Sequence, residues 1–110
     1  MRDPSTYLDH MLKCIGLIED YSKGGMREFL GDRKTQDAVI RNLQTIAESA
    51  KRLPDTMKDK HPEVSWKAVG GLRNVLVHDY LGVDVKQVWE IVSKDLPGLK
   101  RALEAMKKEA

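Results

Sequence analysis

The sequence has few aromatic residues, a single cysteine and little net charge. Aromatic side chains make up 5% of its 110 residues, so aliphatic and methionine side chains must fill most of the interior. The one cysteine, Cys14, excludes an internal disulfide and is typical of a reducing compartment. A formal net charge of +2 is too small to attract nucleic acid by overall charge, so any phosphate binding must depend on locally placed arginine or lysine.

Several sequence signals of membrane, nucleotide and metal sites are also missing. No apolar stretch approaches the length of a membrane span, and the N-terminus has no apolar signal core, so we expect a cytoplasmic protein without a membrane partner. Gly24-Gly25 and Gly70-Gly71 match neither a P-loop nor a dinucleotide-binding loop. His10, His61 and His78 lie far apart, and no histidine or cysteine pair has zinc-ligand spacing. We therefore expect no metal and no cofactor.

The residues that are abundant favour helices. Leu, Ala, Lys, Glu, Met and Arg are good helix formers, and 41% apolar with 33% charged residues suffices for one soluble core. We expect an all-α protein with a single domain over residues 1–110. Cys14 has apolar neighbours, which predicts a buried, inert thiol rather than a nucleophile.

Capping residues and apolar spacing divide the chain into four principal helices. These are expected from Asp3-Pro4 to Gly24, from Asp32 or Thr35 to Leu53, from Ser65 to about Asp79, and from Asp84 onward. A short apolar patch at Met26, Phe29 and Leu30 predicts one or two further turns, and residues 54–64 are expected to form a connecting loop. The pattern predicts an antiparallel four-helix-type bundle.

Two irregularities stand inside these helices. Pro97-Gly98 is expected to kink or split the C-terminal helix, with Asp95 as a possible cap of its second half. Gly70-Gly71 costs about 1 kcal/mol per glycine relative to alanine. The glycines either weaken the helix or, as we favour, allow another helix or a ligand to approach closely.

The chemically capable residues gather in the stretch R-N-V-L-V-H-D-Y. On an ideal helix, Asn74 and His78 share a face, whereas Arg73 and His78 are about 140° apart. A shared Arg–His site would therefore lie at a helix end or a subunit contact. The alternative is a histidine that caps the helix C-terminus, beside exposed ion pairs that contribute little to stability.

The residue types fit cleavage of an RNA phosphodiester without metal. Histidine can move a proton near neutral pH, and arginine can offset charge on the pentavalent phosphate. Asn74 can orient the substrate or the imidazole, and the Tyr80 hydroxyl can donate, accept or be modified. Glu48 lies on the charged face of the second helix. That face is either simply solvated, or it carries Glu48 toward His78 if the two helices are neighbours.

The same stretch resembles the R-x-x-x-x-H-x-Y motif of the HepT-like toxins of the HEPN superfamily. The surroundings are similar too: D-R-K-T-Q-D-A-V-I-R-N-L and I-A-E-S-A-K-R-L-P in the second helix, W-K-A-V-G-G-L-R-N before the motif, and V-W-E-I-V-S-K-D-L-P-G-L after it. The resemblance spans about Tyr7 to Leu103.

The resemblance implies a HEPN-like helical bundle that forms a homodimer, with the motif near a cleft between protomers. It implies a metal-independent ribonuclease acting as the toxin of a toxin–antitoxin pair, with Arg73 and His78 catalytic and Asn74 as a polar helper. The antitoxin would be an MntA-type nucleotidyltransferase that attaches AMP to Tyr80, which otherwise contacts the substrate. A non-catalytic nucleotide-binding or docking subunit of such a nucleotidyltransferase is the alternative.

Overall fold

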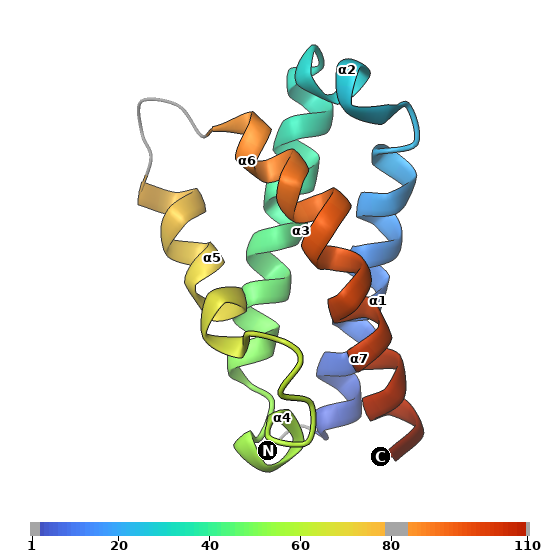
Figure 1. Cartoon of the computed structure of the whole chain (residues 1–110), viewed down its shortest axis with the longest axis vertical. Helices are drawn as coiled ribbons and strands as arrows, with labels where there is room; N and C mark the ends of the chain where they lie inside the picture. Colours follow the sequence, from blue (N-terminus) through green and yellow to red (C-terminus); the bar gives the residue numbers. More distant parts are fainter. Residues whose placement is uncertain (1–2, 79–83, 110) are drawn as a thin grey trace.

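The computed structural model describes the backbone of residues 3–78 and 84–109, and the side chains of these residues except 73–78. Within these ranges every regular element is helical. The elements in chain order are α1 (Pro4–Tyr21), α2 (Gly25–Leu30), α3 (Arg33–Lys51), α4 (Asp55–Lys58), α5 (Trp66–His78), α6 (Val85–Glu90), the π-helical segment η1 (Ile91–Asp95) and α7 (Leu96–Glu109) (Figure 1). The prediction of an all-α fold is confirmed.

The helices begin at the residues that the capping pattern indicates. The Asp3 carboxylate accepts from the Ser5 amide ahead of Pro4, and the Asp32 carboxylate accepts from the amide and hydroxyl of Thr35. Asp32, rather than Thr35, therefore caps α3, and these hydrogen bonds from Thr35 lower the pKa of Asp32. Asp84 caps α6 in the same way, because its carboxylate accepts from the amides of Lys86 and Gln87. These caps satisfy amides that a helix leaves without a partner in its first turn.

α1, α3, α5 and the α6–η1–α7 run lie alongside one another and alternate in direction (Figure 1). The main contacts run in a series: α5 packs on α3, α3 on α1, and α1 on α7. No comparable contact joins α7 to α5 among the described residues, so the circle of helices is open between these two.

The core lies mainly among α1, α3 and α7, and Phe29 of α2 and Val88 of α6 add to it. It is aliphatic, as the shortage of aromatic residues predicts, and Cys14 is buried in it as expected. Burial raises the pKa of the Cys14 thiol, and the positive charge of Lys13 offsets only part of that shift. Fully buried members are Leu8, Met11, Ile15, Ile18, Phe29, Val39, Leu43, Ile46, Val88, Leu103 and Met106.

The C-terminal helix differs from the prediction. The helical path from α6 to α7 is continuous, and Asp95 lies inside it rather than at a helix start. The irregularity is instead the π-helical segment η1, immediately before Leu96-Pro97. A proline removes a backbone donor and crowds the carbonyl four residues earlier, and a wider π turn accommodates both effects without ending the helix.

The segment before α5 is more ordered than a plain loop. It contains the one-turn helix α4, and α3 ends at Lys51, two residues before the predicted end. Trp66 Nε1 donates to the carbonyls of Lys58 and His61, both at 3.1 Å. Ser65 caps α5 through the Ala68 amide, as predicted. The entry to α5 is thus fixed by side-chain hydrogen bonds.

Close helix packing does not explain Gly70 and Gly71. A Cβ atom at Gly70 would meet the Lys51 side chain at 3.7 Å, an ordinary van der Waals distance, and one at Gly71 would meet no described atom within 4 Å. Our interpretation that the glycines admit a neighbouring helix is therefore wrong for α3. At Gly71 the space is open.

Candidate functional site on helix α5

α5 carries the candidate catalytic residues. Arg73 and Asn74 lie in its second half and His78 is its last residue. The helical backbone over Trp66–His78 sets Arg73 and His78 about 140° apart around the axis and Asn74 and His78 about 40° apart, as the sequence predicts. The side chains of Arg73, Asn74 and His78 lie outside the described residues, and so does all of Tyr80. Their roles remain predictions.

The alignment of α3 against α5 places Glu48 relative to the motif. The two helices are antiparallel neighbours (Figure 1), and the Lys51 side chain lies near Gly70. Because the helices are antiparallel, the residue three before Lys51 on α3 and the residue three after Gly70 on α5 lie at the same height. Glu48 is therefore level with Arg73. His78 lies about 7.5 Å further along the α5 axis. The predicted neighbourhood of the two helices is confirmed, and their alignment favours Arg73 over His78 as the motif residue beside Glu48.

An apolar groove of about 640 Å³ separates α5 from the η1–α7 segment. Val64, Val69 and Leu72 line one wall, and the other wall is formed by Ile91, Leu96 and Leu99. Charged side chains, among them Lys94 and Arg101, stand along its length. A polar-rimmed apolar groove of this kind is typical of a surface that another molecule covers.

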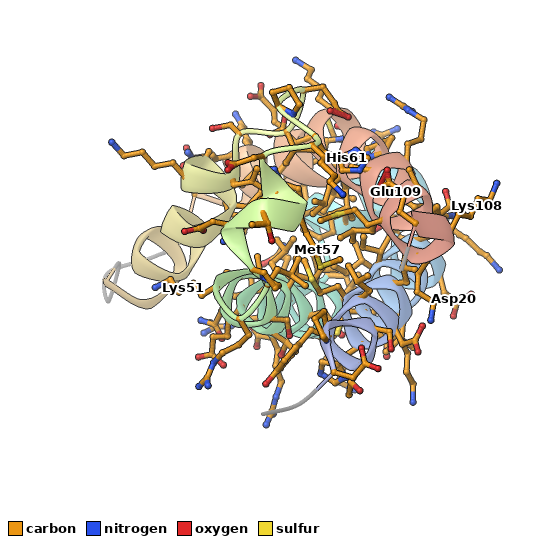
Figure 2. All side chains as sticks on the ribbon, turned by 90° about the horizontal axis from the view of Figure 1, so that it is seen from below. Asp20, Lys51, Met57, His61, Lys108 and Glu109 are labelled. Atoms are coloured by element: carbon orange, nitrogen blue, oxygen red, sulfur yellow. The ribbon has the colours of Figure 1, made fainter. Side chains whose placement is uncertain are left out.

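His61 stands at one end of this groove and was not singled out in the sequence as a site. It is buried; its Nε2 atom lies 2.8 Å from Glu109 Oε1 and its Nδ1 atom lies 3.4 Å from Glu63 Oε2. The hydrogen bond to Glu109 raises the pKa of His61, burial lowers it, and Glu63 raises it further, with a net rise. Figure 2 shows the His61–Glu109 contact between the loop before α5 and the end of α7.

Sequence reasoning could find only half of this cluster. Glu63 is two residues from His61, a visible local signal, whereas Glu109 is 48 residues away and reaches His61 only through the fold. Across residues 3–78 and 84–109, apart from the side chains of 73–78, no group of three or more histidine, cysteine, aspartate or glutamate side chains is arranged to hold a metal ion. None of the described helices is long and apolar enough to cross a membrane.

The sequence and the fold together define a class of protein. Residues 11–106 match the family model described as "Ribonuclease HepT-like", and this range includes α5 and the whole motif. The chain belongs to this HepT-like ribonuclease family.

Individual relatives agree with the family match. "Probable ribonuclease HepT" of Thermococcus cleftensis is 40% identical over 108 residues, which cover 97% of this chain and 98% of the relative. A protein of Caldanaerobacter subterraneus subsp. tengcongensis, named as a candidate RNase, is 37% identical over 111 residues, with 99% of each chain covered. Another named candidate RNase, from Methanocaldococcus jannaschii, is 42% identical over 102 residues, 93% of this chain and 82% of its own. No solved structure matches the chain significantly.

Proposed function

We propose that the protein is a metal-independent endoribonuclease whose site is formed by Arg73 and His78. The observation that carries this proposal is the HepT-like ribonuclease match over residues 11–106, with R-x-x-x-x-H on a helix that has one main packing partner among the described residues. A helix packed on one side leaves its remaining faces available to a substrate.

The proposed reaction is attack of a ribose 2′-oxygen on the neighbouring phosphorus. His78 takes the 2′-hydroxyl proton, the new oxygen–phosphorus bond forms, and the bond from phosphorus to the 5′-oxygen breaks as that oxygen receives a proton from water; His78 then returns its proton to water. The products are a 2′,3′-cyclic phosphate and a 5′-hydroxyl. Arg73, which stays charged, stabilises the additional negative charge on the phosphate oxygens. Asn74 orients the substrate or the imidazole, and Glu48, level with Arg73, is proposed to position its guanidinium.

Cleavage of end-labelled RNA in the presence of EDTA tests this assignment. Because general acid–base catalysis contributes about 10²- to 10⁴-fold, His78→Ala should lower the rate by at least about 100-fold, with Arg73→Ala in the same range. Lys67→Ala removes a charge from an exposed position of the same helix and should leave the rate unchanged. If both motif variants stay folded and cleave as fast as the wild type, the catalytic assignment is wrong.

We also propose that the groove between α5 and α7 is the face of a homodimer. Its apolar walls, left without a helix partner, support this proposal. Ala68 lines the groove but is exposed, so Ala68→Glu can be introduced without disturbing the core. Sedimentation velocity should show a dimer for the wild type and a monomer for Ala68→Glu. The control variant Met26→Glu makes the same kind of change at an exposed site on α2 and should remain a dimer. A wild-type monomer at micromolar concentration would contradict the proposal.

The finer biological role rests on the family resemblance. We propose that the protein is the toxin of a toxin–antitoxin pair and that a partner nucleotidyltransferase inhibits it by transferring AMP to Tyr80. Incubation with that partner and ATP should add the mass of AMP to the wild type and not to Tyr80→Phe. If AMP is added but no wild-type preparation cleaves RNA, the alternative of a non-catalytic docking subunit is favoured instead.

A further inference from the structure

A second, polar groove lies between α1 and α3. It has a volume of about 770 Å³, and α3 lies between it and α5. Lys13 and His10 of α1 face Arg52 of α3 across it, and the hydroxyl groups of Thr6 and Ser49 also line it. Two carboxylates, those of Asp9 and Glu48, line it as well, so its lining is polar and charged rather than apolar.

The cations of this groove differ from those on the other side of α1 in their partners among the described residues. There, Lys107 pairs with Asp9 at 2.7 Å and Lys100 pairs with Glu19 at 3.1 Å. Lys13 and Arg52 are exposed, and neither side chain makes an ion pair or hydrogen bond with any residue that the structure describes.

The two carboxylates at the groove are already engaged. The Asp9 carboxylate is held by Lys107, and Glu48 has an interaction partner of its own. Lys13 and Arg52 are therefore the charged groups of the groove that have no partner among the described residues.

Further cations stand along α3. Lys34, Arg41 and Arg52 are seven and eleven residues apart, so they fall within about 20° of one line on the helix and extend for about 27 Å. Glu48, which has an interaction partner of its own, lies within about 40° of the same line. The side chains of Lys34 and Arg41 are also exposed and, within the described part of the chain, have no ion pair or hydrogen bond. A row of this length exceeds what a single phosphate or mononucleotide could occupy, so its charge pattern fits an extended polyanion.

We propose that the α1–α3 groove and this row of cations bind the phosphodiester backbone of single-stranded RNA. The RNA would pass over the outer face of α3, between the groove and the motif on α5. Lysine, arginine and serine or threonine hydroxyls are the usual partners of backbone phosphates, and such contacts position a strand without reading its sequence. The proposal rests on the proposed ribonuclease function for its substrate, and it adds a binding surface outside the catalytic motif.

Binding of a non-cleavable RNA tests the groove without requiring catalysis. The probe is an oligonucleotide of about 16 nucleotides in which every 2′-oxygen is methylated, with binding followed by fluorescence anisotropy at several salt concentrations. The double variant Lys13→Gln, Arg52→Gln should raise the Kd at least ten-fold. It should also reduce the slope of log K against log salt by about 1.4, since each lost phosphate contact contributes about 0.7 for a single strand.

A matched variant controls for overall charge. Arg27→Gln, Lys108→Gln also removes one arginine and one lysine from exposed positions, on α2 and α7, and should change the Kd less than two-fold. Equal weakening by the two double variants would overturn the proposal, because overall charge would then account for binding. An unchanged Kd in the groove variant would overturn it too.

Cleavage assays separate this inference from the proposed function. The groove variant should cleave a dinucleotide at the wild-type rate and lose kcat/KM only on longer RNA, whereas His78→Ala should bind the methylated RNA normally. If the wild type cleaves no RNA but the groove variant still loses binding, the groove proposal stands and the ribonuclease proposal fails. If cleavage depends on His78 but the groove variant binds and cleaves long RNA normally, the ribonuclease proposal stands and the groove proposal fails.

Discussion

α1 and α5 both pack on α3, but α1 is buried to a much greater extent than residues 66–72, the part of α5 whose side chains the structure describes. α1 also contacts α7, and four of its large apolar side chains, from Leu8 to Ile18, have at most 1% of their surface exposed. Within the described part of the chain α5 has α3 as its one main partner, and its apolar residues Val69 and Leu72 are only partly buried. Arg73, Asn74 and His78 follow on the same helix. The comparison indicates that α1 mainly stabilises the fold, whereas α5 keeps apolar and polar surface for another molecule.

Truncating one apolar side chain on each helix should give the largest difference in stability. Ile15→Ala removes a fully buried side chain and should lower the free energy of unfolding by about 2–5 kcal/mol. Leu72→Ala, at a half-buried position beside the groove, should lower it by half of that or less. Urea unfolding at two protein concentrations measures both, and a concentration dependence confined to Leu72→Ala would support a dimer through α5. Equal losses would contradict the comparison.

The His61–Glu109 contact joins the loop before α5 to the end of α7, and its contribution to the free energy of unfolding should depend on pH. Because the folded-state pKa of His61 is raised above its ordinary value of about 6.5, protonation favours the folded state. This stabilisation is fully present below pH about 6.5 and is lost as pH rises through the folded-state pKa.

Urea unfolding across this pH range, for the wild type and His61→Gln, measures the effect. The wild type should be the more stable at low pH, and the pH-dependent part of the difference should disappear at high pH. Glu109→Gln should weaken the pH dependence more than Glu63→Gln, because Glu109 is the nearer carboxylate. If the difference in free energy of unfolding between the wild type and His61→Gln grows as pH rises, the imidazole is not stabilised in its charged form.

Two glycines should give the smallest effects, of opposite sign. Gly71→Ala should raise the free energy of unfolding of the monomer by about 1 kcal/mol, since the added methyl group meets open space and alanine favours the helix. Gly25→Ala should lower it by about 1–2 kcal/mol, because Gly25 has φ +86°. Thermal unfolding followed by circular dichroism measures both. If Gly71→Ala stabilises the fold but weakens dimerisation or RNA binding, the open space at Gly71 belongs to an interface.

The elements were largely predictable because their signals are local. Asp3, Asp32 and Asp84 act through amides two or three residues away, so their capping roles can be read from adjacent letters. The proline at position 97 marked the right place for an irregularity but not its form. Whether a helix splits or widens into a π turn depends on packing along its whole length, which outweighs the local preference at one residue.

The candidate site was predictable as residues but not as an arrangement. The motif and its flanks indicated Arg73, Asn74, His78 and Tyr80, and helical geometry gave the angles between Arg73, Asn74 and His78. The position of Glu48 level with Arg73 required the alignment of α3 against α5. The cluster of His61 with Glu109 and the groove between α1 and α3 had no sequence signal, because each brings together residues distant along the chain.

By itself, the sequence determined the helical class, the caps, the aliphatic core and the family motif, since each depends on residue type and short-range spacing. Only the tertiary structure decided that α5 would pack chiefly on α3 and leave a groove toward α7. It also decided that Lys13 and Arg52 would have no partner among the described residues, whereas Lys100 and Lys107 pair with carboxylates on α1. The physical reason is that burial and charge pairing depend on which helix faces are brought together in three dimensions.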